Sequence, residues 1–187
     1  MEKPSCKLLL VDDSDEDRLR FQVAFWHAKP LHLRLLPRLA SCDDVCLYLG
    51  GEGRYSDRLR YPFPDLLLLD LKMPGKGGFD VLKFIRQRKL RLFTIISSDS
   101  RQHHDIARAI SLGANDYLQK LSNLFDIADC IRMLDDSAAR WVASQSWSHS
   151  STSPPCPEAR GNDDSQLEAY DDDVSMMRTS PFNTSPL

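Results

Sequence analysis

Hydrophobic residues along the chain alternate between two kinds of segment. Short aliphatic runs, three to five residues long, are separated by longer stretches in which apolar residues recur every three or four positions. The runs predict β-strands and the longer stretches predict α-helices. The five predicted strands are 7–11, 33–36, 66–69, 93–96 and 116–118. Regular alternation of strand and helix is the signature of βαβ units and a parallel sheet.

Five helices are predicted between and after these strands, at 15–29, 42–49, 79–88, 103–112 and about 124–142. Their ends carry ordinary stop signals, because Pro30 follows the first helix and glycines follow the second and the fourth. The last helix places an apolar stripe, from Leu124 to Trp141, on one side. The pattern therefore predicts an α/β fold with a doubly wound five-stranded parallel sheet, (βα)5.

The character of the chain changes near residue 143. Residues 144–187 are rich in Ser, Pro and Asp and hold few apolar side chains that could offset the entropy of ordering. We therefore expect one domain over 1–143, followed by a disordered tail over 144–187. No part of this tail offers the helices of a DNA-reading helix-turn-helix, so no DNA-binding domain is expected.

Composition narrows the choice of function without deciding it. The net charge of −3 and the pI near 5.9 of these 187 residues give no general attraction to nucleic acid. The start of the chain lacks a signal-peptide pattern, and no apolar run approaches the ~20 residues that span a bilayer. The five cysteines are scattered and contain no Cys-x-x-Cys pair. We therefore expect a cytoplasmic protein with reduced cysteines and no membrane partner.

Polar side chains gather where the predicted strands end. In an open parallel sheet, ligands bind beyond the carboxyl ends of the strands. Those ends carry Asp12-Asp13 after the first strand, Asp70 after the third, Ser97-Ser98 after the fourth and Lys120 after the fifth. Three carboxylates in one crevice would repel one another unless a cation lay among them, and oxygen ligands favour Mg²⁺. The sequence thus predicts a magnesium site formed by Asp12, Asp13 and Asp70.

The same residues suggest phosphoryl-transfer chemistry. A carboxylate such as Asp70 can ligate the ion and also attack phosphorus to give an acyl phosphate. Ser97 could then hydrogen-bond a phosphoryl oxygen, and Lys120 could neutralise another.

Four motifs carry a family resemblance, in the order expected for that family. They are residues 8–13 (LLLVDD), 69–75 (LDLKMPG), 96–98 (ISS) and 113–120 (GANDYLQK). Together they resemble the flavodoxin-like, CheY-like receiver domain of two-component response regulators, over about residues 6–142. The 48–70 region, with its GEGRY loop, is similar to stand-alone receivers related to cyanobacterial phytochrome response regulators.

The resemblance implies a role for each matching position. Asp70 would be the phosphoacceptor, Asp13 a direct Mg²⁺ ligand, Asp12 a ligand largely through water, and the backbone carbonyl of Lys72 a third protein ligand. Ser97 would bind the phosphoryl group and move with it, and Lys120 would pair with that group. Tyr117 would be the aromatic switch residue, whose inward or outward rotamer reports the state of the site.

A single-domain response regulator is therefore the leading interpretation, a phosphoacceptor rather than an enzyme. Its expected partners are a sensor histidine kinase or phosphotransfer protein and a downstream protein target, and the chain itself would be a monomer or a homodimer. One position departs from the family, because Leu121 stands where a proline with a cis peptide usually follows the lysine. A cis bond before a non-proline residue costs roughly 2.5–4 kcal/mol, so we expect a trans bond and a locally different loop.

Two other interpretations remain open on the sequence. Leu121 is compatible with a constitutive interaction module that does not switch. A magnesium-dependent phosphohydrolase would also use an aspartyl nucleophile, but such enzymes typically place a second Asp two residues later. Lys72 occupies that position here.

Overall fold

The sheet has five parallel strands in the order β2-β1-β3-β4-β5. A computed structural model describes residues 5–100 and 102–146. The strands are β1 Cys6–Val11, β2 Leu33–Leu35, β3 Leu66–Asp70, β4 Phe93–Ser98 and β5 Asp116–Gln119. This order is that of flavodoxin-like folds, so the predicted fold class is confirmed.

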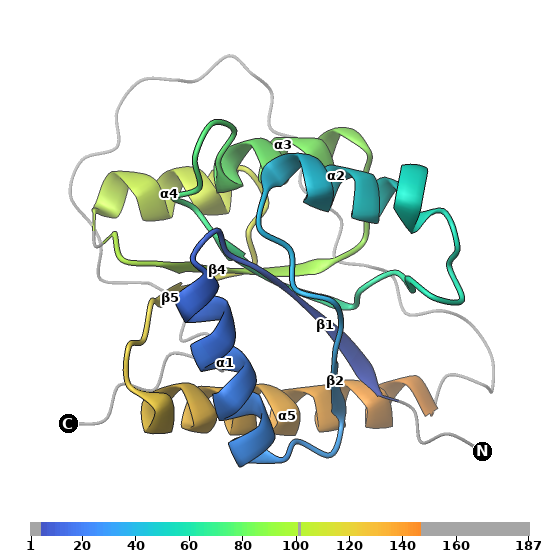
Figure 1. Ribbon diagram of the computed structural model, residues 1–187, viewed down its shortest axis with the longest axis vertical. Helices are drawn as coiled ribbons and strands as arrows, with labels where there is room; N and C mark the ends of the chain where they lie inside the picture. The colour runs from blue at the N-terminus through green and yellow to red at the C-terminus, as the bar shows by residue number, and fades with distance from the viewer. Residues whose placement is uncertain (1–4, 101, 147–187) are drawn as a thin grey trace.

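Helices cover both faces of the sheet. The helices are α1 Asp15–Ala28, α2 Cys42–Gly50, η1 Gly53–Tyr55 (a single 3₁₀ turn), α3 Gly78–Gln87, α4 His103–Ser111 and α5 Leu124–Ser146. Figure 1 shows α2, α3 and α4 on one side of the sheet and α1 with α5 on the other. None of the helices in the described ranges is long and apolar enough to cross a membrane.

Each face of the sheet contributes its own set of side chains to a hydrophobic core. Because side chains alternate along a strand, Leu9 and Val11 pack under α2–α4, while Leu8 and Leu10 pack against α1 and α5. Most of these side chains are almost completely buried. The aliphatic runs are therefore hydrophobic on consecutive residues because both faces of the parallel sheet are covered.

Element boundaries differ from those predicted by a few residues at most. β4 continues through Ser98, two residues beyond the predicted strand, and α5 continues to Ser146 rather than about 142. The turn η1 was not predicted, since the glycines around it indicated only a loop. Residues 147–187, the greater part of the predicted tail, lie outside the described residues.

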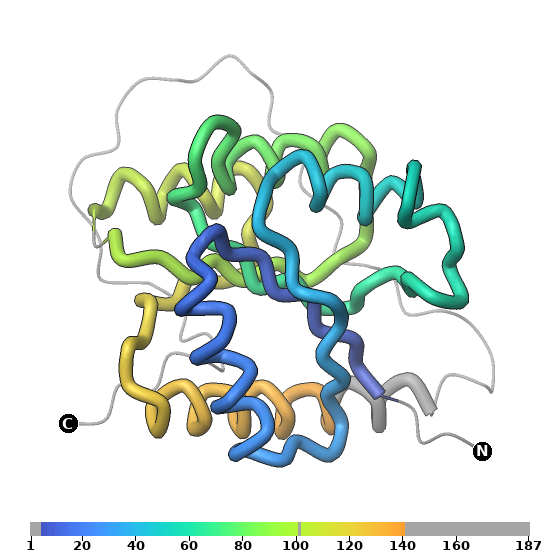
Figure 2. The backbone as a smooth tube through the Cα atoms, in the orientation of Figure 1, coloured from blue at the N-terminus to red at the C-terminus, as the bar shows by residue number. Residues whose placement is uncertain are grey.

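The connection between α2 and β3 projects beyond the end of the sheet (Figure 2). Its backbone is held by Arg58, whose guanidinium donates to the Tyr48 carbonyl and the Leu49 carbonyl, each at 2.8 Å. These carbonyls belong to the last turn of α2, beyond which the helix supplies no further N–H groups to bond them. The loop is thereby anchored near the amino ends of the strands, opposite the carboxyl ends that carry the carboxylates.

Candidate phosphoacceptor site

Three carboxylates meet at the carboxyl ends of β1 and β3. Asp12 and Asp13 follow the last residue of β1, and Asp70 is the last residue of β3. One oxygen from each carboxylate lies within 4.8 Å of the other two. Asp12 is 5% and Asp70 4% exposed. The predicted cluster of acidic side chains is therefore present in the folded chain.

Local backbone hydrogen bonds hold two of these side chains in place. Asp12 Oδ1 accepts the backbone N–H of Ser14 at 2.9 Å, and Ser14 in turn caps the N-terminus of α1. Asp70 Oδ1 accepts the backbone N–H of Lys72 at 3.0 Å, which brings the Lys72 backbone next to the site. The β3–α3 loop can close this tightly because Gly78 has no side chain. A Cβ there would lie 2.4 Å from the Asp70 carbonyl oxygen.

Lys120 reaches into the cluster from the end of β5. Its Nζ lies 2.9 Å from Asp12 Oδ2, 3.1 Å from Asp70 Oδ2 and 2.7 Å from Asp17 Oδ2. The described residues contain no cis peptide bond, so the Lys120–Leu121 bond is trans, as expected. The lysine nonetheless contacts Asp70. Asp17 was not among the predicted site residues, because an acidic residue in the first turn of a helix usually faces solvent.

Burial and charge oppose one another at this site. Burial raises the pKa of the Asp12 carboxyl above its ordinary value, and the hydrogen bond from Lys120 offsets only part of that effect. For Lys120, burial alone would lower the pKa. Hydrogen bonds to Asp17 and Asp12, together with the charges of Asp70 and Asp12, outweigh burial and raise the Lys120 pKa. The ammonium therefore stays charged and offsets part of the negative charge of the cluster.

Two serines end β4, and one of them, Ser97, faces the site. Ser97 is paired in register with Asp70, and it lines a pocket together with Asp12 and Lys120. Ser98, the next and last residue of β4, points to the other face of the sheet, is fully buried, and its Oγ accepts the N–H of Ser100 at 3.3 Å. Of the two serines, Ser97 is therefore the one placed to contact a group attached to Asp70.

Tyr117 is half-buried on β5 and is connected to the β4–α4 loop. Its hydroxyl donates to the Ser100 carbonyl at 2.8 Å, and the Ser100 hydroxyl donates to Asp105 at 2.6 Å. Since Ser100 also bonds Ser98, a chain of hydrogen bonds links the end of β4 to Tyr117.

The donor set fits a hard divalent cation. Asp12, Asp13 and Asp70 provide only oxygen atoms, which suit Mg²⁺ or Mn²⁺ better than softer metals. A divalent ion would also relieve the cost of keeping the buried Asp12 carboxylate ionised beside Asp70. This acidic pocket is therefore suited to bind such an ion.

Comparison with known proteins identifies the family. A model of the response regulator receiver domain matches residues 54–132. The crystal structure of response regulator RPA3017, in red light signalling of R. palustris, is 33% identical, with a TM-score of 0.63. That match covers 69% of this chain and 90% of RPA3017. This chain belongs to the receiver-domain family of response regulators.

Two further solved structures of response regulators are similar to this chain in sequence and fold. The phosphorylated cyanobacterial phytochrome response regulator RcpA is 26% identical, covering 72% of this chain and 94% of RcpA, with a TM-score of 0.63. The Mn²⁺-bound form of response regulator Rcp1 is 27% identical, covering 80% of this chain and 99% of Rcp1, with a TM-score of 0.59. Curated relatives are much longer: the match spans 21% of the DNA-binding transcriptional regulator NtrC of Klebsiella pneumoniae (34% identical) and 25% of the response regulator SaeR of Staphylococcus aureus (38% identical).

Proposed function

We propose that this receiver is a magnesium-dependent phosphorylation switch in which Asp70 accepts a phosphoryl group. The observation that carries the proposal is the position of Asp70, which ends β3 within 4.8 Å of the Asp12 and Asp13 ligand atoms and 3.1 Å from the Lys120 ammonium. The group would come from a phosphohistidine on a sensor histidine kinase or a phosphotransfer protein. The switch would operate in the cytoplasm, as a phosphoacceptor rather than as an enzyme.

The ligands proposed for Mg²⁺ are the Asp12, Asp13 and Asp70 carboxylates and the Lys72 backbone carbonyl. Asp13 would bind the ion directly and Asp12 largely through water, as the family resemblance implies. When bound, the ion would neutralise carboxylate and phosphoryl oxygens. Support comes from the all-oxygen donor set and from the Lys72 backbone N–H, which donates to Asp70 at 3.0 Å and so keeps the Lys72 backbone next to the site.

The transfer step is a displacement at phosphorus. A carboxylate oxygen of Asp70 forms a bond to phosphorus while the bond from phosphorus to the donor's imidazole nitrogen breaks. The electron pair of the broken bond stays on the imidazole nitrogen. Lys120 compensates negative charge on one phosphoryl oxygen, and the Ser97 hydroxyl donates to another. Such catalysis consists mainly of positioning and charge compensation.

Tyr117 would carry the signal away from the site. If the serine at the end of β4 moves toward the phosphoryl group, the Ser98–Ser100–Tyr117 hydrogen bonds give that motion a path to the surface. A downstream protein that contacts this surface would then bind with altered affinity.

Intact-mass measurement tests the proposal. The wild-type receiver, incubated with Mg²⁺ and acetyl phosphate, should gain one phosphoryl mass, and chelation of Mg²⁺ or the substitution Asp70→Asn should prevent the gain. Ser97→Ala should slow the gain more than Ser98→Ala in the same assay, because the Ser98 hydroxyl lies on the other face of the sheet. No gain in wild type at saturating Mg²⁺ contradicts the proposal.

A second candidate function is a receiver-like interaction module that does not switch. The trans bond before Leu121 favours it, because the usual family loop at this position is absent. This alternative predicts equal affinity for a bound partner with and without phosphodonor. The Lys120–Asp70 contact at 3.1 Å supports the switch instead, since the trans loop leaves the lysine within reach.

A further inference from the structure

The Lys120 ammonium has three N–H donors, and three carboxylates surround it. Of these contacts the one to Asp17 is the shortest, at 2.7 Å. Asp17 belongs to the first turn of α1 and is not part of the cluster whose oxygens could share a cation. It is therefore the partner of Lys120 that a bound ion does not engage.

Phosphorylation would change the other two partners. Asp70 would lose its carboxylate charge on becoming an acyl phosphate, and Asp12 would be drawn toward the cation. We propose that Asp17 is a positioning residue, which holds the Lys120 ammonium beside the phosphoryl group while Asp12 and Asp70 are engaged elsewhere. The inference rests on the proposed phosphoacceptor function and adds to it a role for the first turn of α1.

Asp17 is itself held in one place. Its backbone N–H donates to the Ser14 hydroxyl at 3.2 Å, which fixes the first turn of the helix. Its Oδ1 accepts from Arg20 at 2.6 Å while its Oδ2 faces Lys120. The Asp17 side chain is 26% exposed and that of Lys120 14%, so solvent competes only partly for the pair. A carboxylate fixed between two cations can serve as an anchor for the more mobile of them.

The loop after β5 explains why an anchor is useful here. The Lys120 backbone is fixed by its N–H bond to the Ser98 carbonyl at 3.0 Å, but the following peptide is trans and leads to Leu121. A lysine side chain has many rotamers, and the loss of this freedom opposes holding its ammonium in one position. Asp17 supplies that restraint from a helix on the α1–α5 face of the sheet.

A matched pair of variants tests this role. Asp17→Asn removes the charge that faces Lys120. Glu16→Gln removes a neighbouring charge that pairs with Arg20 alone, so it serves as the control. At saturating Mg²⁺ and with acetyl phosphate as donor, we expect Asp17→Asn to slow phosphorylation of Asp70 about tenfold, the scale of one charge-assisted hydrogen bond at a partly exposed site. Glu16→Gln should change the rate less than about twofold.

Two further measurements separate positioning from a general effect of charge or folding. Mg²⁺ affinity, measured by calorimetry, should change equally in Asp17→Asn and Glu16→Gln, because neither residue ligates the ion. In a Lys120→Gln background, Asp17→Asn should have no additional effect on the rate, since its partner is gone. Asp17→Glu, which keeps the charge, should recover part of the wild-type rate.

The outcomes are distinct. If wild type is phosphorylated but Asp17→Asn reacts as fast as Glu16→Gln or faster, the positioning role is wrong and the proposed function stands. A further loss of rate in the Lys120→Gln background would also overturn the role, because Asp17 would then act through something other than Lys120. If wild type itself gains no phosphoryl group, the proposed function fails first.

Discussion

At the scale of single residues, the site is a balance between carboxylates and the cations that oppose them. Asp12 is buried beside Asp70. Among the described residues, Lys120 is the cation that contacts both carboxylates. Lys120 carries one positive charge against the three carboxylates of the cluster. The metal-free protein therefore retains an electrostatic cost that a divalent ion would remove.

This balance predicts how magnesium affects stability. Mg²⁺ at 100 times its Kd should stabilise the wild-type fold by about 2.7 kcal/mol, the mass-action value for one site. Asp13→Asn should lose most of that gain, because Asp13 contributes to the cation cluster without contacting Lys120. Thermal melts with and without Mg²⁺ measure the effect. Asp15→Asn, at an exposed position that pairs with Arg18, is the control and should keep the full gain.

The raised pKa of Asp12 predicts a pH dependence of the same effect. Burial lifts this pKa above its ordinary value, so the folded protein takes up a proton at a higher pH than the unfolded chain does. For this group, the metal-free fold thus gains stability as the pH falls through the raised pKa. A cation needs the ionised carboxylate, so the Mg²⁺-induced rise in Tm should shrink as the pH falls from neutral toward the ordinary carboxyl range. A rise that stays constant would contradict this account of Asp12.

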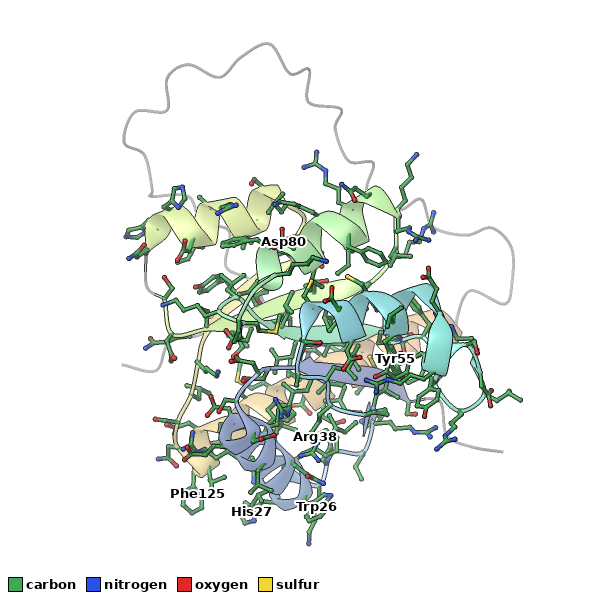
Figure 3. The ribbon with its side chains drawn as sticks, turned by 45° about the horizontal axis from the view of Figure 1, so that its top comes forward. Trp26, His27, Arg38, Tyr55, Asp80 and Phe125 are labelled. Atoms are coloured by element: carbon green, nitrogen blue, oxygen red, sulfur yellow. The ribbon has the colours of Figure 1, made fainter. Side chains whose placement is uncertain are left out.

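At the scale of elements, α1 links the site to an exposed apolar surface. Leu19, Val23 and Trp26 recur at helical spacing and are 58%, 41% and 69% exposed, although the opposite side of α1 packs into the core. His27 continues the surface to α5, because its ring meets Phe125 edge-on (Figure 3). If Asp70 accepts its phosphoryl group from a phosphohistidine protein, as proposed above, then α1, with its first turn at Lys120 and its outer side apolar, is the surface that we expect this protein to contact.

A comparison of two phosphoryl donors, acetyl phosphate and a phosphorylated protein, tests the role of this α1 surface. Leu19→Ser with Trp26→Ala should leave phosphorylation by acetyl phosphate unchanged and slow transfer from a phosphorylated protein donor at least tenfold, as loss of buried apolar contacts at an interface would. Leu59→Ser is the control, since Leu59 is 98% exposed in the α2–β3 connection, which leads into the amino end of β3, away from Asp70. Equal transfer rates in the double variant and the control would exclude α1 as the donor surface.

Most helices and strands could be predicted from the sequence. The spacing of their hydrophobic residues and the residues that end them lie within the element or directly beside it. The aliphatic runs around Leu9 and Leu67 and the glycine stop at Gly51 are examples. The end of β4 was predicted two residues too early because it is set by pairing with β5, which the local pattern does not contain. Asp17 was missed for a similar reason, since its partner Lys120 is more than a hundred residues away.

At the scale of the whole molecule, one buried carboxylate connects α5 to β2 through hydrogen bonds. Asp135 of α5 accepts the backbone N–H groups of Leu31, His32 and Leu33 at 2.7–2.8 Å. These donors lie at the start of β2 and just before it, and the isolated pattern of α5 gave no sign of such a long-range contact. The carboxylate thus fixes the α1–β2 connection against α5 on that face of the sheet.

Removing the Asp135 carboxylate should destabilise the fold. Asp135→Ala leaves three backbone donors without their partner and should lower the free energy of unfolding by about 2–3 kcal/mol. Asp136→Ala, at the exposed neighbouring position, should have little effect. Urea denaturation of both variants measures the difference, and equal midpoints would show that the contact contributes nothing.

Location of the phosphoryl group on Asp70 tests the central claim most directly. Borohydride converts an aspartyl phosphate into homoserine, which peptide mass spectrometry can place in the chain. After treatment with Mg²⁺ and acetyl phosphate, homoserine should be found at position 70 in wild type and should be absent in Asp70→Asn or when Mg²⁺ is chelated. Homoserine at another aspartate, or none at position 70 under saturating Mg²⁺, would contradict the account.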